Sequence, residues 1–321
     1  IYDTILLKKE YQMKLKELLQ NWVDKYAKLA LKERSYNGYA DVIRLHINPI
    51  LGNYDIQDIT PTILQDYVIE KLKSGNLITH EPLASNSVCR IVSVLKQAFH
   101  LALNLDLISK DPTTTIKLPT TSEKEVLALT REEQKIVEEY CLKSNKNNYI
   151  GIIICLYTGI RLGELLALTW EDIDFNKKYL YIKKTSYTIK RNGKNTIVTD
   201  TPKTKKSNRL IPIPAKLIQL LAIYKSKSFC KYIIHTYKNK MVETRSYQRT
   251  FESILNKCKI KHYNFHCLRH TFATRALELR MDIKTLSEIL GHTNVAITLN
   301  RYAHSLLEYK IQEMNKIVQI L

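Results

Sequence analysis

The sequence predicts a mainly α-helical protein with a small antiparallel β-sheet, in which an all-helical N-terminal half precedes a mixed α/β half. Three observations predict this class. Apolar residues recur with helical spacing from about residue 10 to residue 99. A stretch rich in Thr, Ser and Pro, residues 112–124, then interrupts the helical pattern. Beyond it, Asn192-Gly193 lies between β-like segments, which is a strong hairpin signal.

The first two helices of the N-terminal half are expected over residues 10–28 and around residues 39–47. Leucines and aromatic residues fall on one face of the first segment at helical spacing. The second segment has the same spacing, and we expect Pro49 and Gly52 to interrupt it.

The third and fourth helices have clear start signals. Thr60 is a good N-cap, and Pro61 fits the first helical position. Gly75 is expected to end this helix. The fourth helix is expected to start at Ser85 and to carry apolar residues as far as Phe99.

The C-terminal half opens with another helix start. Thr130 is the predicted N-cap, and Glu133 completes a capping box. An apolar helix is expected over residues 150–157, stopping at Gly159.

Three strands are expected next, at residues 180–182, 196–198 and 209–212, the first two joined through the turn at Asn192-Gly193. A long helical tract is expected to resume after Thr244.

Charge indicates the class of partner. Lysine and arginine total 50 against 31 acidic residues in 321, which gives a net charge of +19 and a pI near 9.5. This excess favours a polyanion such as DNA, with membrane surfaces and acidic proteins as the competing partners. No run of about 18 apolar residues is present, so we expect no transmembrane helix.

The six cysteines are scattered without a C-x-x-C pair, which argues against a zinc ribbon or a disulfide framework and favours reduced thiols in a cytoplasm. No signal peptide is visible. The chain does not begin with methionine, so we expect the natural protein to extend further at its N-terminus.

Four ordered motifs carry the chemistry. In chain order they are T-G-I-R-L-G-E-L at residues 158–165, H-C-L-R-H-T at 266–271, L-G-H-T at 290–293 and R-Y-A-H at 301–304.

These residue types suit phosphate chemistry. Arg161 and Arg269 present planar, permanently charged guanidiniums that match the non-bridging oxygens of a phosphate. His266 and His292 can donate to the same phosphate or move protons. Tyr302 is the candidate nucleophile, although an unperturbed phenol attacks poorly at neutral pH.

The motifs resemble those of the tyrosine recombinase (phage integrase) family, and the resemblance covers nearly the whole chain. It implies a helical core-binding, SAM-like DNA-binding domain at residues 10–112, after an N-terminal extension at 1–9. It also implies a linker at 113–124 and a mixed α/β catalytic domain at 125–321 that ends in a C-terminal helix, 306–321. The nearest likeness is to integrases of phages and conjugative transposons, which often carry an additional arm-binding domain.

The resemblance also implies the reaction. Tyr302 would form a 3′-phosphotyrosine while a 5′-hydroxyl leaves, without metal, nucleotide or other cofactor. The family supplies the leaving-group proton from a lysine on a β-hairpin. Lys203 best matches the family's K-T-K pattern, and Lys205 and Lys206 remain alternatives for this general acid.

Two neighbours of these motifs have competing interpretations. Glu164 either orients Arg161 through a salt bridge or is a helix-surface acid. His270 shares a helix face with His266, which resembles half of a zinc-protease motif, but Cys267 stands where that motif needs glutamate. We therefore expect no metal site, and we expect His270 either to support the site residues from behind or to pack.

Residues at two helix starts are candidate DNA contacts, because hydroxyls and amides at helix N-termini suit phosphate binding. Plain capping is the alternative for Ser35 and Ser85. The candidates, with one lysine of the basic segment, are Lys32, Arg34, Ser35, Tyr36, Asn86, Ser87, Arg90 and Lys205.

The function predicted from these features is that of a site-specific DNA recombinase of a mobile element in the bacterial cytoplasm. Its expected partners are double-stranded DNA, three further copies of the chain held through residues 306–321, and accessory DNA-bending or excision proteins. The alternatives are a type IB topoisomerase-like enzyme and a non-enzymatic DNA-binding regulator. A membrane-binding basic protein is a weaker alternative, because the 306–321 helix carries few lysines.

Overall fold

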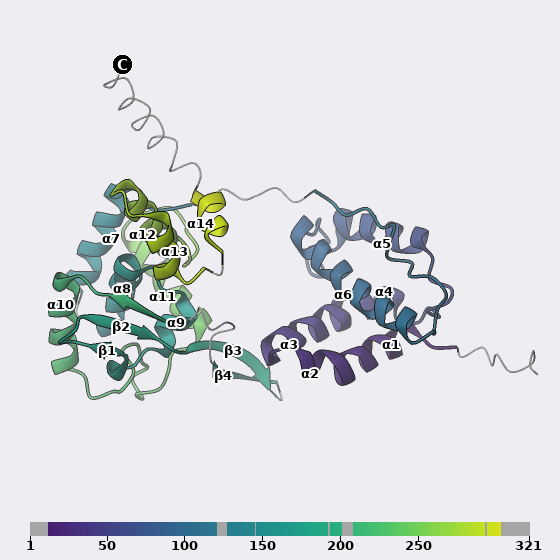
Figure 1. Cartoon of the computed structure of the whole chain (residues 1–321), viewed down its shortest axis with the longest axis horizontal. Helices are drawn as coiled ribbons and strands as arrows, with labels where there is room; N and C mark the ends of the chain where they lie inside the picture. Colours follow the sequence, from purple (N-terminus) through teal and green to yellow (C-terminus); the bar gives the residue numbers. More distant parts are fainter. Residues whose placement is uncertain are drawn as a thin grey trace, which may run out of the picture. The chain divides into compact units, whose positions relative to one another are not determined.

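The structure is a computed structural model of the chain, and it divides into two compact units, residues 1–123 and 124–321 (Figure 1). Its described residues are mainly helical with short antiparallel strands, which confirms the predicted fold class. The described residues are 12–120, 127–144, 146–191, 193–200, 208–292 and 294–302.

Two helical tracts open the first unit, and each contains a π-helical stretch. The first consists of α1 (Leu15–Trp22), η1 (Val23–Ala27) and α2 (Lys28–Ala30). The second consists of α3 (Glu33–Val42), η2 (Ile43–Ile47) and α4 (Asn48–Leu51).

The second tract runs through Pro49 and ends at Gly52, so the predicted interruption at Pro49 is wrong. Pro49 lies in the first turn of α4, after the π-helical stretch has shifted the hydrogen-bond register. At this position an amide hydrogen would have no partner within α4, so proline is tolerated.

The next two helices, α5 (Pro61–Ser74) and α6 (Ser85–Asn104), begin where the sequence predicts. The Thr60 hydroxyl accepts a hydrogen bond from the Ile63 amide at 3.3 Å, which confirms this N-cap. Helix α6 supplies much of the core of the first unit, because its predicted apolar face is at most 2% exposed throughout. The residues of this face are Val88, Ile91, Val92, Leu95 and Phe99.

The second unit begins with α7 (Arg131–Lys143), η3 (Asn147–Tyr149), α8 (Ile150–Thr158), α9 (Leu162–Ala167) and η4 (Trp170–Asp172). The predicted capping box of α7 is confirmed. The Thr130 hydroxyl accepts from the Glu133 amide at 3.1 Å, and the Glu133 carboxylate accepts from the Thr130 amide at 2.9 Å. Helix α8 is buried along most of its length and forms the centre of this unit's core.

The strands form two antiparallel sheets. The first has the order β1 (Ile173–Asp174), β2 (Tyr179–Ile182) and β5 (Arg209–Pro212), with Ile182 opposite Arg209. The second is the hairpin of β3 (Thr185–Arg191) and β4 (Lys194–Asp200), which extends away from the helices of this unit in Figure 1.

The predicted pairing of residues 180–182 with 196–198 is therefore wrong. A two-residue turn at 192–193 places Arg191 opposite Lys194, so the strand entering the turn must be the residues directly before it. That strand, β3, was missed, and β2 pairs instead with β1 and β5.

Five helices complete the described part of the second unit: α10 (Ala215–Ser226), α11 (Thr244–Lys257), α12 (Cys267–Glu278), α13 (Ile283–Leu290) and α14 (Val295–Tyr302). The predicted helical tract after Thr244 is thus four helices. All six cysteines are free thiols. Within the described ranges, every helix is too short or too polar to cross a lipid bilayer.

Candidate active site

Arg161 occupies the N-cap position of α9, two residues after the left-handed Gly159 that ends α8. The carboxylate of Glu164, in the first turn of α9, accepts hydrogen bonds from the Arg161 amide at 2.9 Å and from its Nη1 at 3.0 Å. The side chain of Arg161 is 37% exposed, so a ligand can reach it from solvent.

Glu164 is only 4% exposed, so its interpretation as a helix-surface acid is wrong. Its two oxygens also accept from Arg209 on β5, at 3.0 Å from Nη1 and 2.8 Å from Nη2. Burial alone would raise the pKa of the Glu164 carboxyl. Hydrogen bonds and charge from Arg209 and Arg161 outweigh burial and hold this pKa at about 2, so the group is ionised at neutral pH.

Arg269 lies in the first turn of α12 and is 2% exposed. It donates to the carbonyl of Gly159 at 2.8 Å and to that of Leu290 at 2.7 Å. These two bonds join the turn before α9 to the end of α13, so both arginine motifs meet at one place.

Three arginines donate to three consecutive carbonyls at the end of α13. Arg209 Nε bonds to Ile289 at 2.6 Å, Arg269 Nη2 to Leu290 at 2.7 Å and Arg161 Nη2 to Gly291 at 3.2 Å. The last carbonyls of a helix lack partners within the helix and carry its negative dipole end, which suits cations. Left-handed Gly291 turns the chain there, and the next residue is His292.

His292 is oriented by α14. Its Nδ1 lies 2.8 Å from the hydroxyl of Thr298, a residue of α14 that is 1% exposed, and its amide donates to Ser287 at 3.0 Å. No short sequence pattern marks Thr298, so the motifs do not predict its role.

His266 occupies the N-cap position of α12, and its ring packs edge-to-face on that of His270 with 4.6 Å between centroids. This contact fits the packing interpretation of His270. Among the described residues, no group of three or more His, Cys, Asp or Glu side chains is arranged to hold a metal ion.

Tyr302 is the last residue of α14, and its side chain lies outside the described part of the structure. Lys203, Lys205 and Lys206 lie outside the described residues, as does the predicted helix 306–321.

The candidate DNA contacts of the first unit lie on two helices that contact each other. A methyl group added at Gly38 of α3 would be 2.3 Å from Nη2 of Arg90 on α6, so the Arg90 guanidinium lies against α3. The cap interpretation of Ser35 and Ser85 is wrong, because the N-cap positions belong to Lys32 and Ala84. Arg34, Asn86, Ser87 and Arg90 are exposed, and Lys32, Ser35 and Tyr36 are half-buried.

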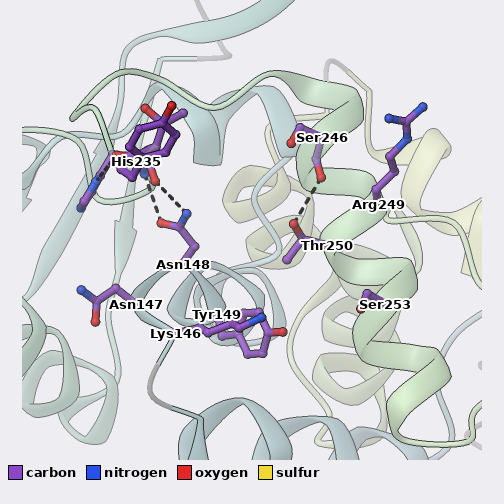
Figure 2. A pocket seen from close by; sticks show the side chains of 11 residues that line it. Lys146, Asn147, Asn148, Tyr149, His235, Ser246, Arg249, Thr250 and Ser253 are labelled. Atoms are coloured by element: carbon purple, nitrogen blue, oxygen red, sulfur yellow. Dashed lines mark hydrogen bonds between the residues drawn. The ribbon is translucent and has the colours of Figure 1, made fainter.

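A pocket of about 520 Å³ lies elsewhere in the second unit, at the start of α8 and α11 (Figure 2). Asn148 fixes one wall by bonding to the carbonyl and amide of His235 at 2.7 and 3.1 Å. Among the described residues that line it there is no carboxylate, and Arg161 follows the opposite end of α8. The pocket is lined by Lys146, Asn147, Asn148, Tyr149, His235, Thr236, Tyr237, Ser246, Arg249, Thr250 and Ser253.

Comparison with protein families gives matches in both units. Residues 121–308 match the phage integrase family, and residues 14–72 match the phage integrase N-terminal SAM-like domain.

Curated relatives are similar over most of their length. A tyrosine recombinase XerC-like protein of Caldanaerobacter subterraneus subsp. tengcongensis is 28% identical, covering 92% of this chain and 80% of the relative. The transposase from transposon Tn916 of Enterococcus faecalis is 27% identical, covering 83% of this chain and 68% of the relative. The ICEBs1 integrase of Bacillus subtilis is 27% identical, covering 85% and 74%.

Solved structures share the fold. The Tn1549 transposon integrase bound to a circular intermediate DNA has a TM-score of 0.79 at 22% identity, covering 95% of this chain and 99% of that chain. A lambda integrase tetramer bound to a Holliday junction has a TM-score of 0.68 at 18% identity, covering 90% and 80%.

Proposed function

Because the chain belongs to the phage integrase family, we propose that it is a site-specific DNA recombinase of a mobile element that cleaves and rejoins DNA through a phosphotyrosine. The family match covers more than half of the chain. The named relatives include a transposon transposase and an integrase, which supports a role in moving DNA rather than relaxing it.

In the proposed reaction, the Tyr302 phenolate attacks a backbone phosphate, giving a 3′-phosphotyrosine and releasing the 5′-oxygen. Arg161 and Arg269 bind the non-bridging oxygens, where negative charge increases in the transition state. His266 and His292 hold or move protons at the same phosphate. Rejoining reverses the step, and needs no nucleotide because the phosphoester energy is retained.

The leaving 5′-oxygen must take up a proton. We assign this proton to Lys203, with Lys205 and Lys206 as the alternatives, on the basis of the family's lysine pattern.

The observation that carries the proposal is the gathering of both arginine motifs and His292 at the end of α13. Arg161 and Arg269 come from motifs more than one hundred residues apart, and they bond to the adjacent carbonyls of Gly291 and Leu290. A regulator that only binds DNA would not need two guanidiniums and a histidine focused on one point.

The proposed DNA contacts are those on α3 and α6 of the first unit, where exposed Arg34 and Arg90 suit phosphates. We include Lys205 among them, and the basic pocket around Lys146 and Arg249 suits a phosphate as well.

We further propose that four copies assemble on DNA through residues 306–321, because recombination needs four strand cuts and each chain has one nucleophile. The lambda integrase tetramer on a Holliday junction supports this proposal. We also propose that accessory DNA-bending or excision proteins take part and that the protein acts in a bacterial cytoplasm. The topoisomerase and regulator alternatives are not favoured by the comparisons.

A covalent-adduct assay tests the proposal. Wild type and Tyr302→Phe are incubated in EDTA with nicked duplexes from the DNA flanking the gene, and run on SDS gels. We expect an SDS-resistant adduct with the wild type and none with Tyr302→Phe. An adduct that persists in Tyr302→Phe would exclude this tyrosine, and binding without any adduct would favour a regulator.

A further inference from the structure

Arg209, at the start of β5, is a buried arginine that the proposed reaction does not yet use. Its side chain is 6% exposed. Nη1 and Nη2 donate to the two oxygens of Glu164 at 3.0 and 2.8 Å, and Nε donates to the Ile289 carbonyl at 2.6 Å. The guanidinium thus joins three elements: β5, the first turn of α9 and the end of α13.

Stability alone does not account for this arrangement. A buried ion pair can often be replaced by apolar residues of similar volume without loss of stability, because desolvation offsets much of the attraction. What distinguishes Arg209 is the identity of its partners. Glu164 holds Arg161, and Ile289 lies three residues before His292.

Arg209 also changes the charge balance around Arg161. Arg161 and Glu164 alone would sum to zero, and the carboxylate would compete with a phosphate for the Arg161 guanidinium. With Arg209 included, two guanidiniums share one carboxylate and the cluster has a net charge of +1. That net charge lies beside the exposed part of Arg161, where a phosphate would bind.

Arg209 also lies close to the backbone of Gly291. Gly291 has a φ of +66°, and a methyl group added there would lie 3.0 Å from Nη1 of Arg209. The backbone that leads into His292 therefore packs directly on the Arg209 guanidinium.

We propose that Arg209 is a positioning residue for DNA cleavage: it offsets the negative charge of Glu164, so that Glu164 competes less with the phosphate for Arg161, and it fixes the end of α13 that presents His292. This inference rests on the proposed recombinase function. Arg209 itself touches no reacting atom in this scheme.

The test measures the single-turnover rate of adduct formation for wild type, Arg209→Met, Arg209→Lys and Arg131→Met. Arg131 is the matched control, because its guanidinium pairs with Glu278 at 2.9 Å but is 71% exposed. We expect Arg209→Met to slow cleavage by about 10- to 100-fold, the range found when hydrogen-bond partners that orient metal-ligating side chains are removed. Arg209→Lys should recover part of the lost cleavage rate, since lysine keeps the positive charge but cannot donate two parallel hydrogen bonds to the carboxylate. Arg131→Met should stay within about twofold of wild type.

A second substrate distinguishes a positioning role of Arg209 from a general effect of the substitution on folding. It carries a methylphosphonate at the cleavage position mapped with wild type, so the reacting group has one negative charge fewer. If Arg209 offsets the charge of Glu164 beside the phosphate, the Arg209→Met defect should be smaller by about tenfold or more on this neutral substrate. Binding of the ordinary duplex, measured by gel shift, should change by less than about threefold.

Equal defects on the two substrates would overturn the inference, because a loosened fold does not distinguish them. Wild-type rates for Arg209→Met on the ordinary duplex would overturn it as well. If Arg209→Met does not fold, Arg209→Lys answers the same question, and an identical fractional loss on both substrates would reject the proposal. Absence of an adduct with the wild type itself would overturn the proposed function and this inference with it.

Discussion

At the scale of single residues, Glu164 links the stability of the second unit to pH. Its carboxylate is buried and bonds to two guanidiniums, which hold its pKa at about 2 against an ordinary value of 4.5. Because the folded pKa lies below the unfolded one, the stabilisation is fully present above about pH 4.5 and is lost as pH falls towards 2.

Glu164→Gln should therefore destabilise the second unit at pH 7, on the order of 3 kcal/mol from this shift. The difference from wild type should shrink as pH falls from 4.5 towards 2. Urea unfolding at a series of pH values measures it. Glu139→Gln is the control, because the Glu139 carboxylate is 51% exposed and should contribute less than about 0.5 kcal/mol. A difference that stays constant with pH would contradict the assigned ionisation.

Sequence motifs predict the residues of the candidate site better than they predict the residues that hold these side chains in place. Arg161 and Arg269 stand in short local patterns and could be named from sequence alone. Arg209 could not, because its partner Glu164 lies 45 residues away and only the pairing of β5 brings them together. Thr298 was missed for a similar reason, since its hydrogen bond to His292 depends on the turn between α13 and α14.

At the scale of secondary-structure elements, local signals predicted helix starts well and strand pairing poorly. Thr60 and Thr130 cap their helices as expected, because a capping bond spans only three residues. The partner of a strand is set by long-range packing, so β2 was assigned to the wrong neighbour. The π-helical stretches were also missed, because the apolar spacing around Val23 and Ile43 does not distinguish them from α-helix.

The turn between α8 and α9 gives a prediction at this scale. Gly159 has a φ of +63°, and a methyl group there would lie 2.4 Å from Cδ1 of Phe272 and 2.8 Å from Cδ2 of Leu290. Gly159→Ala should destabilise the second unit by about 3 kcal/mol, combining left-handed strain with overpacking. It should also slow cleavage, since the Gly159 carbonyl holds Arg269.

Gly193→Ala is the matched control for Gly159→Ala. Its φ is +75°, but no described atom lies within 4 Å of an added methyl group. Only the strain of about 1 to 2 kcal/mol applies there. Equal losses of unfolding free energy in the two variants would show that crowding at the α8–α9 turn is unimportant.

At the scale of the whole molecule, the chain has separate hydrophobic cores. The core of the first unit is built around α6, and that of the second around α8 and its neighbours. Each unit therefore has its own source of stability, so we expect two unfolding transitions.

Phe99→Ala and Phe251→Ala test this separation, because both side chains are 0% exposed and they belong to different cores. Each should lose about 3 to 5 kcal/mol in its own unit. In differential scanning calorimetry, Phe99→Ala should lower one transition and Phe251→Ala the other. A joint shift of both transitions in either variant would show that the units unfold as one.

The three carbonyls at the end of α13 also bear on which forms of the chain could cut DNA under the proposed function. Their arginines come from the α8–α9 turn, β5 and α12, so the site exists only when these elements have all docked. A nascent or partly denatured chain keeps its positive charge and can still adhere to DNA, yet it lacks an assembled phosphate clamp. If Tyr302 is the nucleophile, as proposed, such a chain should bind DNA without cutting it.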